Sequence, residues 1–167
     1  MFFSEIYGSW RKIQEEKYEG LWSILGRDFF AAFEKRRVLD LGCGSGYFES
    51  FLRSRGVNAG IISVDVEFTK KVSPFVIADG DSLPFRDGSF DIVVCVDTAH
   101  LLGGSDFRRV LRKNGILLMS VFFNGTNYGE RAEMLKEKLG GFEILLEFET
   151  GKRERDCVIV AKNSMTS

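Results

Sequence analysis

The stretch VLDLGCGSG, Val38 to Gly46, carries the strongest structural signal in the chain. A short apolar run leads into Gly42, Gly44 and Gly46, and the apolar spacing of the residues that follow is typical of a helix. The glycines therefore belong to a strand-to-helix turn. Because glycine lacks a Cβ, such a turn lets a ligand lie against the backbone at the start of the helix.

The spacing of these glycines argues against a dinucleotide loop. A loop of the type GxGxxG would need glycine at position 47, where the chain has Tyr47. The third glycine, Gly46, comes one residue early. A pyrophosphate requires the wider turn, whereas a cofactor without phosphate can lie flat against the shorter one. The loop therefore favours a cofactor that presents no phosphate to it.

Beyond this turn, short apolar runs alternate with helix-like or turn-like stretches. Such alternation predicts buried parallel strands in a doubly wound α/β sheet. Helices are expected from the glycine turn to residue 55 and over 67–72, 105–112 and 129–139. The runs that we expect to form the parallel strands are VLDLG, GIISVDV, FVIAD, DIVVCVD and GILLMSVF.

The C-terminal part departs from this alternation. FEILLEFET is followed by Gly151 and Lys152 and then by DCVIVAKN, and so short a connection allows only a hairpin. The expected fold is a Rossmann-like, doubly wound, mostly parallel seven-stranded sheet with an antiparallel C-terminal hairpin strand. A chain of 167 residues has the length of one domain. We expect a single domain over 1–167, with an N-terminal helical lid over 1–36 and a cofactor-binding core over 37–162.

Composition places the chain among ordinary globular proteins. The apolar fraction is 44%, and the formal net charge of −1 gives no general attraction for phosphate backbones. Nucleic acid is therefore neither supported nor excluded as a partner. The 3 cysteines are widely spaced, which argues against a disulfide framework and a cysteine metal site. With no recognisable targeting signal or membrane span, we expect a cytoplasmic protein without a metal.

The glycine stretch also resembles a known motif. VLDLGCGSG is similar to the first motif of the class I S-adenosylmethionine-dependent methyltransferases, whose sheet also ends in an antiparallel hairpin strand. The resemblance extends from about Arg37 to Lys162. It implies S-adenosylmethionine as the cofactor, with the glycine backbone near its methionine portion and Asp40 near its amino group. The charges agree, because a carboxylate offsets an ammonium.

Asp65 ends the second apolar run, in IISVDV. A carboxylate at this point can accept hydrogen bonds from both hydroxyls of a ribose. The methyltransferase family places its ribose-binding acid here, and a dinucleotide fold also places an acid here. Asp65 therefore supports binding of an adenosine ribose without deciding between the two cofactors.

A third motif, ADGDSLPFRDGSFD, narrows the resemblance. It is similar to the GDAxxLPF-like stretch of the subgroup that includes the ubiquinone-biosynthesis and related small-molecule methyltransferases. Gly80, Asp81 and Ser82 match its first positions, with serine in place of the usual alanine. The resemblance implies that Asp81 accepts a hydrogen bond from the adenine amino group and that the Ser82 backbone donates to the ring.

The fourth apolar run ends in CVDTAHLL, where the methyl acceptor should meet the cofactor. The chain has 1 histidine, His100, which is our candidate general base. The alternative is that His100 is structural and hydrogen-bonded to the backbone. Asp97 either faces the methionine end of the cofactor or caps the following turn. The exocyclic-amine methyltransferases of DNA, RNA and protein glutamine carry an Asn-Pro-Pro-Tyr-type sequence at this strand end. VDTA does not match it, which argues against acceptors of that class.

Other polar and aromatic residues are candidates for the acceptor pocket, although each is as compatible with a loop or the core. The N-terminal segment is a candidate lid, and the basic residues around the C-terminal hairpin turn are expected to form a solvated tip. The residues after the fifth run are Phe122, Phe123, Asn124, Asn127 and Tyr128; the lid aromatics are Tyr7, Trp10, Tyr18 and Trp22; the tip residues are Lys152, Arg153 and Arg155.

Together these motifs predict an enzyme that transfers the methyl group of S-adenosylmethionine to a small-molecule acceptor and leaves S-adenosylhomocysteine. Two alternatives stay open: a methyltransferase acting on RNA or protein, and a non-catalytic cofactor-binding subunit. The usual site of family-specific insertions, between the fifth and sixth strands, holds only one expected helix, so we hypothesise that a homodimer mate or a partner protein completes the acceptor site.

Overall fold

The computed structural model describes residues 2–68 and 74–164, with side chains from residue 8 onward. Helices and strands alternate through most of this part of the chain. Their bounds are α1 Phe2–Ala31, η1 Ala32–Lys35, β1 Val38–Leu41, α2 Tyr47–Ser54, β2 Ile61–Asp65, β3 Phe75–Ile77, β4 Phe90–Cys95, η2 Ala99–Leu101, α3 Phe107–Val110, β5 Leu111–Phe123, α4 Tyr128–Lys138, β6 Phe142–Thr150 and β7 Arg155–Asn163.

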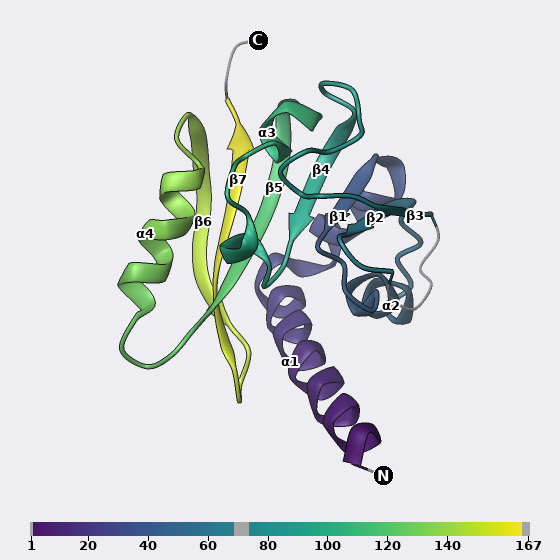
Figure 1. Cartoon of the computed structure of the whole chain (residues 1–167), viewed down its shortest axis with the longest axis vertical. Coiled ribbons are helices and arrows are strands. Elements are labelled where there is room, and N and C mark those ends of the chain that lie inside the picture. Colours follow the sequence, from purple (N-terminus) through teal and green to yellow (C-terminus); the bar gives the residue numbers. More distant parts are fainter. Residues whose placement is uncertain (1, 69–73, 165–167) are drawn as a thin grey trace.

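The strands form a seven-stranded sheet in the order β3-β2-β1-β4-β5-β7-β6. The pairs from β3 to β5 are parallel, while β7 runs antiparallel to both β5 and β6. This arrangement confirms the predicted Rossmann-like sheet with its C-terminal hairpin (Figure 1). The strand order reverses between β1 and β4, and the carboxyl ends of strands flanking such a reversal are where open α/β sheets bind ligands.

Alternating side chains on the strands build a core on each face of the sheet. Val38 packs with α1 and α2, whereas its neighbour Leu39 packs with α3 and α4. Both side chains are fully buried. Because successive residues of a strand point to opposite faces, continuous apolar runs such as VLDL are what a sheet covered on both faces requires.

Two expected helices differ from the structure. The helix expected over 105–112 is reduced to α3, because Leu111 already pairs with Phe90 as the first residue of β5. Strand pairing has replaced the last turn of helix, and the register shifts before Ile116 pairs with Ile92. Of the helix expected over 67–72, residues 67 and 68 are not helical, and the rest lies outside the described residues.

Helix α1 packs against the sheet with its C-terminal part, and Figure 1 shows its N-terminal part extending past the lower ends of the strands. At Gly20 the helix approaches β6 so closely that a Cβ would lie 1.9 Å from Thr150 Oγ1. The Thr150 hydroxyl donates a hydrogen bond to the Lys17 carbonyl at 2.5 Å. Glycine at position 20 therefore permits the contact that fixes α1 to the end of the sheet.

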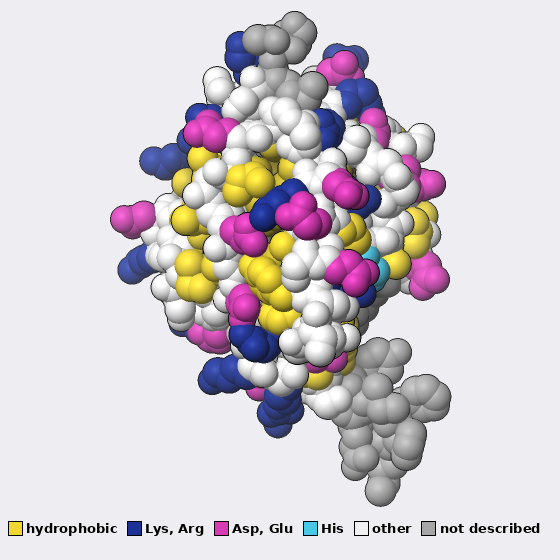
Figure 2. Space-filling model, turned by 90° about the vertical axis from the view of Figure 1, so that its left-hand side faces the viewer, with side chains coloured by type: hydrophobic (Ala, Val, Ile, Leu, Met, Phe, Trp, Pro, Cys, Tyr) yellow, Lys and Arg dark blue, Asp and Glu magenta, His cyan; other side chains and the backbone are white. Residues whose placement is uncertain are grey.

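The side of the molecule formed by α4 and β6 carries apolar patches among charges of both signs (Figure 2). Ile144, Leu145 and Leu146 of the edge strand β6 are exposed. Glutamates of β6 form ion pairs with lysines of neighbouring elements, as Glu147 does with Lys136. No helix in the described part of the chain is both long and apolar enough to cross a membrane.

Candidate functional site

The glycine turn lies at the carboxyl end of β1, beside β2 and β4. The N–H groups of Gly42 and Cys43 donate to the Val64 carbonyl at 2.8 and 3.1 Å, which anchors the turn to β2. Gly42 has a φ of 75°, and a Cβ there would lie 2.5 Å from Thr98 Oγ1. Gly44, with a φ of 52°, has open space where its Cβ would be. The turn therefore needs glycine for packing at one position and presents bare backbone to a ligand at the next.

Asp65 ends β2 next to this turn, as the sequence predicted. Its Oδ2 accepts a hydrogen bond from the Gly44 N–H at 2.9 Å, and its Oδ1 lies 3.3 Å from the Glu67 nitrogen, which donates to it. A carboxylate oxygen accepts more than one hydrogen bond, so these contacts leave capacity for hydroxyl donors. The structure thus links the expected ribose-binding acid directly to the glycine turn.

Asp40 lies on β1 beneath the same turn. Its side chain is buried, and Oδ2 has no hydrogen-bond partner among the described residues. Burial, reinforced by the nearby carboxylates of Glu49 and Asp65, raises the pKa of Asp40 to about 7. A buried oxygen without a partner is costly, and a cationic group placed beside it would stabilise the ionised form.

The third sequence motif lies at the loop that follows β3. Both carboxylate oxygens of Asp81 accept hydrogen bonds at 2.8 Å from the N–H groups of Gly103 and Gly104, and the Ser82 N–H donates to the Asp79 carbonyl at 3.0 Å. A Cβ at Gly80 would meet a side-chain carbon of Leu102 at 2.6 Å. Here the motif joins two loops, and its roles toward adenine stay predictions.

A cavity of about 450 Å³ opens beside the glycine turn. The turn and the end of β4 form its floor, while α1, Phe122 and the tip of the β6–β7 hairpin enclose the other side. Its lining residues are Trp10, Gln14, Tyr18, Gly42, Cys43, Gly44, Ser45, Tyr47, Val96, Asp97, Thr98, His100, Leu101, Phe122 and Glu154. The lid aromatics Trp10 and Tyr18 therefore border the cavity.

Behind the lining of this cavity lies a buried lysine that sequence reasoning missed. Lys17 of α1 is fully buried, with Nζ 2.8 Å from Asp156 Oδ1, 2.9 Å from Asp97 Oδ2 and 3.5 Å from Glu154 Oε2. Burial lowers the pKa of Lys17, but Asp156 and Asp97 outweigh it and raise the pKa above its ordinary value. The lysine is therefore charged and holds α1, β4 and β7 together.

A signal for this lysine was present in the helical spacing. Gln14, Lys17, Tyr18 and Leu21 share the inward face of α1, and all are buried. The spacing i, i+3, i+4 and i+7 marks a core-facing stripe, and a lysine within such a stripe needs a buried carboxylate partner. Which carboxylates would meet it could not be read from the chain, because Asp97 is 80 residues away.

Asp97 lies two residues after the end of β4 in a left-handed backbone conformation, with a φ of 58°. Its Oδ1 accepts a hydrogen bond from the Phe122 N–H at 3.1 Å, and its Oδ2 binds Lys17. Thr98, rather than Asp97, precedes η2, and no side-chain hydrogen bond caps that turn. The carboxylate therefore faces the α1 side of the cavity, and its contact with a cofactor stays a prediction.

His100 lies in η2 at the rim of the cavity and is exposed. No hydrogen bond to another described residue fixes its imidazole, so the alternative of a backbone-bonded histidine is not what the structure shows. The service of His100 as a base stays a prediction.

The structure separates the other candidate residues. Phe122 lines the cavity, but the Asn124 N–H donates to Asn127 Oδ1 within their shared loop at 2.8 Å, and the Tyr128 hydroxyl donates to Glu147 at 3.0 Å. Phe123 is buried on the other face of β5. Of the remaining lid aromatics, Trp22 stacks on Phe30 in the core, and the side chain of Tyr7 lies outside the described residues.

The basic hairpin residues Lys152, Arg153 and Arg155 are exposed, as expected of a solvated tip, and two of them also form ion pairs. Arg153 forms an ion pair with Glu16 of α1 at 3.2 Å, and Arg155 pairs with Glu149 while its guanidinium lies 5.2 Å from the centre of the Phe123 ring. The Arg153–Glu16 pair ties the hairpin tip to α1, and Glu154 of the same tip lines the cavity. The tip is thus part of the wall.

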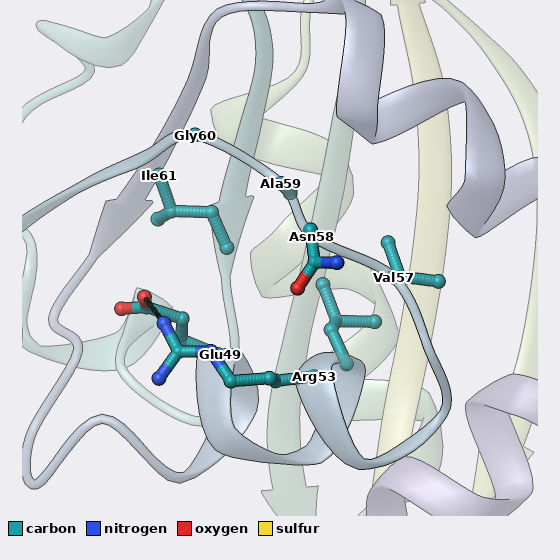
Figure 3. A pocket seen from close by; sticks show the side chains of 8 residues that line it. Glu49, Arg53, Val57, Asn58, Ala59, Gly60 and Ile61 are labelled. Carbon is teal, nitrogen blue, oxygen red and sulfur yellow. Dashed lines mark hydrogen bonds and ion pairs between the residues drawn. The ribbon is translucent and has the colours of Figure 1, made fainter.

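A smaller hollow of about 160 Å³ lies elsewhere, between α2 and the start of β2 (Figure 3). Figure 3 shows the Arg53 guanidinium turned toward Glu49, and their ion pair is 2.8 Å long. Asn58 borders the hollow from the loop that enters β2, and Ile61 borders it as the first residue of that strand. This hollow has few groups that could direct chemistry. No group of three metal-ligating side chains occurs in the described ranges of the chain.

Comparison with known proteins agrees with the fold. A family model described as "Methyltransferase domain" matches residues 39–119. The malonyl-[acyl-carrier protein] O-methyltransferase of Geobacter sulfurreducens is 31% identical over 136 residues, which cover 72% of this chain and 50% of that protein. The chain therefore spans about half the length of this curated relative.

Two solved structures cover nearly all of this chain. One is a putative methyltransferase from Haloferax volcanii in complex with the Trm112 methyltransferase activator, with a TM-score of 0.66, 14% identity and coverage of 96% of this chain and 97% of that one. The other is the Burkholderia thailandensis 1,6-didemethyltoxoflavin-N1-methyltransferase, determined with S-adenosylhomocysteine, with a TM-score of 0.62, 17% identity and coverage of 97% and 90%. At these identities the likeness concerns the fold.

Proposed function

Because this chain belongs to the class I S-adenosylmethionine-dependent methyltransferase family, we propose that it transfers the methyl group of S-adenosylmethionine to a small-molecule acceptor. The observation that carries the proposal is the glycine turn, joined to Asp65 and underlain by Asp40, which lines a cavity of about 450 Å³. The narrower likeness to the ubiquinone-biosynthesis subgroup stays a prediction.

The residues of the site fit this cofactor. The unpartnered Oδ2 of Asp40 suits the amino group, and the open side of Gly44 suits close approach of the methionine portion. Asp65 would receive the ribose hydroxyls, and Gly80, Asp81 and Ser82 would border the adenine. Bound S-adenosylmethionine supplies a methyl group that its sulfonium has already activated. The chain's own contribution is then to orient the acceptor and exclude water.

Residues of three separate elements border the cavity, which favours a small acceptor over a macromolecule. Trp10, Phe122 and Glu154 border the space from α1, β5 and the hairpin tip. We propose that His100, at the rim, takes the proton that an acceptor loses. Histidine is the side chain that most often serves as a base near neutral pH.

Partners and location also belong to this proposal. The Haloferax structure contains an activator protein, and by analogy a partner or a second copy would complete the acceptor site here. The described cysteines, Cys43, Cys95 and Cys157, are free and buried. Thiols kept in this state are typical of a reducing compartment, which supports a cytoplasmic location.

Incubation with S-adenosylmethionine carrying a labelled methyl group tests the acceptor class. The labelled cofactor and the chain are added to an extract of the source cells, and portions are treated with ribonuclease or protease before fractionation. Label that stays in small metabolites after both treatments is the expected result. Label released only by ribonuclease or only by protease would favour RNA or protein as acceptor. Absence of label, with the cofactor bound, would favour a non-catalytic subunit.

A further inference from the structure

The acceptor side of the cavity has a charge and a set of aromatic rings that its occupant must match. We propose that the methyl acceptor is an amine that is cationic at neutral pH, held by Glu154 and by the rings of Trp10 and Phe122. This inference rests on the proposed methyl transfer and names the chemical class of its acceptor.

The first support is the excess of carboxylates on this side. Asp97 and Glu154 line the cavity, and the described lining contains no lysine or arginine. Lys17 lies behind them and is fully buried, so it offers its charge to the carboxylates rather than to the cavity. With Asp156, three carboxylates surround this one ammonium. The cluster therefore carries net negative charge when its acids are ionised.

The second support is the accessibility of Glu154. Its side chain is 33% exposed, compared with 13% for Asp97 and 0% for Asp156. Its contact with Lys17 is also the longest of the three, at 3.5 Å between Nζ and Oε2. Glu154 is therefore the carboxylate most able to turn toward an entering cation. An anionic acceptor would meet repulsion from the same group.

The third support comes from the aromatic rings. Trp10 and Phe122 are 42% and 37% exposed at the cavity. The Lys17 ammonium lies 5.9 Å from the centre of the Trp10 ring and 5.8 Å from that of Phe122, so both rings already accommodate a cation of the protein. An ammonium over an aromatic face is attracted by the negative charge of the π system. The exposed parts of these rings would favour a second, external cation.

Methyl transfer to such an acceptor conserves atoms and charge. The bound ammonium first gives one proton to a base, for which His100 at the rim is placed, and so exposes the nitrogen lone pair. That pair forms the bond to the methyl carbon while the carbon–sulfur bond breaks, and the bonding electrons stay on sulfur as the thioether of S-adenosylhomocysteine. The product is an N-methylated ammonium. Glu154 then faces a cation at the beginning and at the end of the reaction.

Two probes of matched shape and opposite charge test the inference. The full chain is saturated with S-adenosylhomocysteine and titrated with phenethylamine or 3-phenylpropionate, with Trp10 fluorescence as the readout. Trp22, the other tryptophan, is replaced by phenylalanine to isolate that signal. We expect phenethylamine to bind at least about tenfold more tightly than 3-phenylpropionate, because the charge and the rings both favour the cation.

Glu154→Gln keeps the size of the side chain and removes its charge. The amine should then bind about tenfold more weakly, with the carboxylate probe unchanged or tighter. Glu149→Gln is the matched control, because Glu149 lies on the same hairpin, outside the cavity lining, and pairs with Arg155. The control should bind both probes as the parent chain does.

The possible outcomes distinguish failure of the amine acceptor from failure of the proposed methyl transfer. Equal affinity for the probes, tighter binding of 3-phenylpropionate, or binding of neither at millimolar concentration would overturn the amine acceptor while S-adenosylhomocysteine still binds. An amine preference that survives Glu154→Gln would overturn the role of Glu154. Failure of S-adenosylhomocysteine to bind at all would instead overturn the proposed methyl transfer.

Discussion

The cofactor side and the acceptor side of the cavity are assembled by different kinds of contact. On the cofactor side, Asp40, the glycine turn and Asp65 come from two successive strands and the turn between them, and the Gly44 N–H joins Asp65 directly. On the acceptor side, Lys17 reaches across 80 residues to Asp97, and Glu16 reaches across 137 to Arg153. The first side is a local motif, whereas the second exists only after the chain has folded.

Because of this difference, we expect substitutions on the acceptor side to affect mainly the stability of the fold, and substitutions on the cofactor side to affect mainly cofactor binding. Removing a group on the acceptor side should loosen the junction of α1 with the sheet, since buried charges there depend on one another. Removing a group on the cofactor side should weaken binding of the cofactor without loosening that junction. The changes below test that separation, beginning with the largest expected effect.

Lys17→Met should lower the free energy of unfolding by about 3 to 5 kcal/mol, because Asp156 would be left buried without its cation. Chemical denaturation monitored by circular dichroism measures this change. Lys12→Met, at an exposed position of the same helix, is the control and should have little effect. Adding Asp156→Asn to Lys17→Met should recover part of the loss. A loss no larger than that of the control would show that the ion cluster does not hold α1.

His100→Ala should lower kcat about a hundredfold and leave the affinity for S-adenosylhomocysteine unchanged, if the rim imidazole takes the acceptor's proton. The measurement is turnover with an identified acceptor together with calorimetry of the product cofactor. His100→Gln retains a polar side chain that cannot act as a base and should be equally slow. Normal turnover of the glutamine variant would exclude proton transfer as the role of His100.

Asp65→Ala should weaken binding of S-adenosylhomocysteine by about 1 to 3 kcal/mol, because ribose hydroxyls and the Gly44 N–H lose their acceptor. Calorimetry measures the affinity, and thermal unfolding without ligand checks that the fold persists. Asp28→Ala, at an exposed position of α1, serves as the control. Unchanged affinity in the Asp65 variant would refute the ribose contact.

Asp40 should make the ligand-free fold less stable as pH rises from about 4 to about 7. Its pKa is about 7 in the fold against 3.8 ordinarily, so across this window the unfolded chain has lost the proton that the folded chain retains. Compared with Asp40→Asn, the parent should lose at most about 1.4 kcal/mol for each pH unit. Parallel stability curves for the two proteins would contradict a raised pKa.

The strands, the C-terminal hairpin and the glycine turn could be predicted because they depend on local patterns. Continuous apolar runs marked the strands, and the short Gly151–Lys152 connection marked the hairpin. The strand start at Leu111 was misassigned to a helix, since pairing with Phe90 is a contact between distant segments. For the same reason the partners of Lys17 and the approach of Glu154 to the cavity were hidden in the sequence.

Isothermal titration calorimetry of the chain with S-adenosylhomocysteine and, separately, with NAD tests the central claim most directly. Position 47 holds tyrosine where a dinucleotide loop needs glycine, and Asp40 and Asp65 lie at the turn. We therefore predict that S-adenosylhomocysteine binds and that NAD gives no heat above dilution. Binding of NAD without binding of S-adenosylhomocysteine would contradict the account.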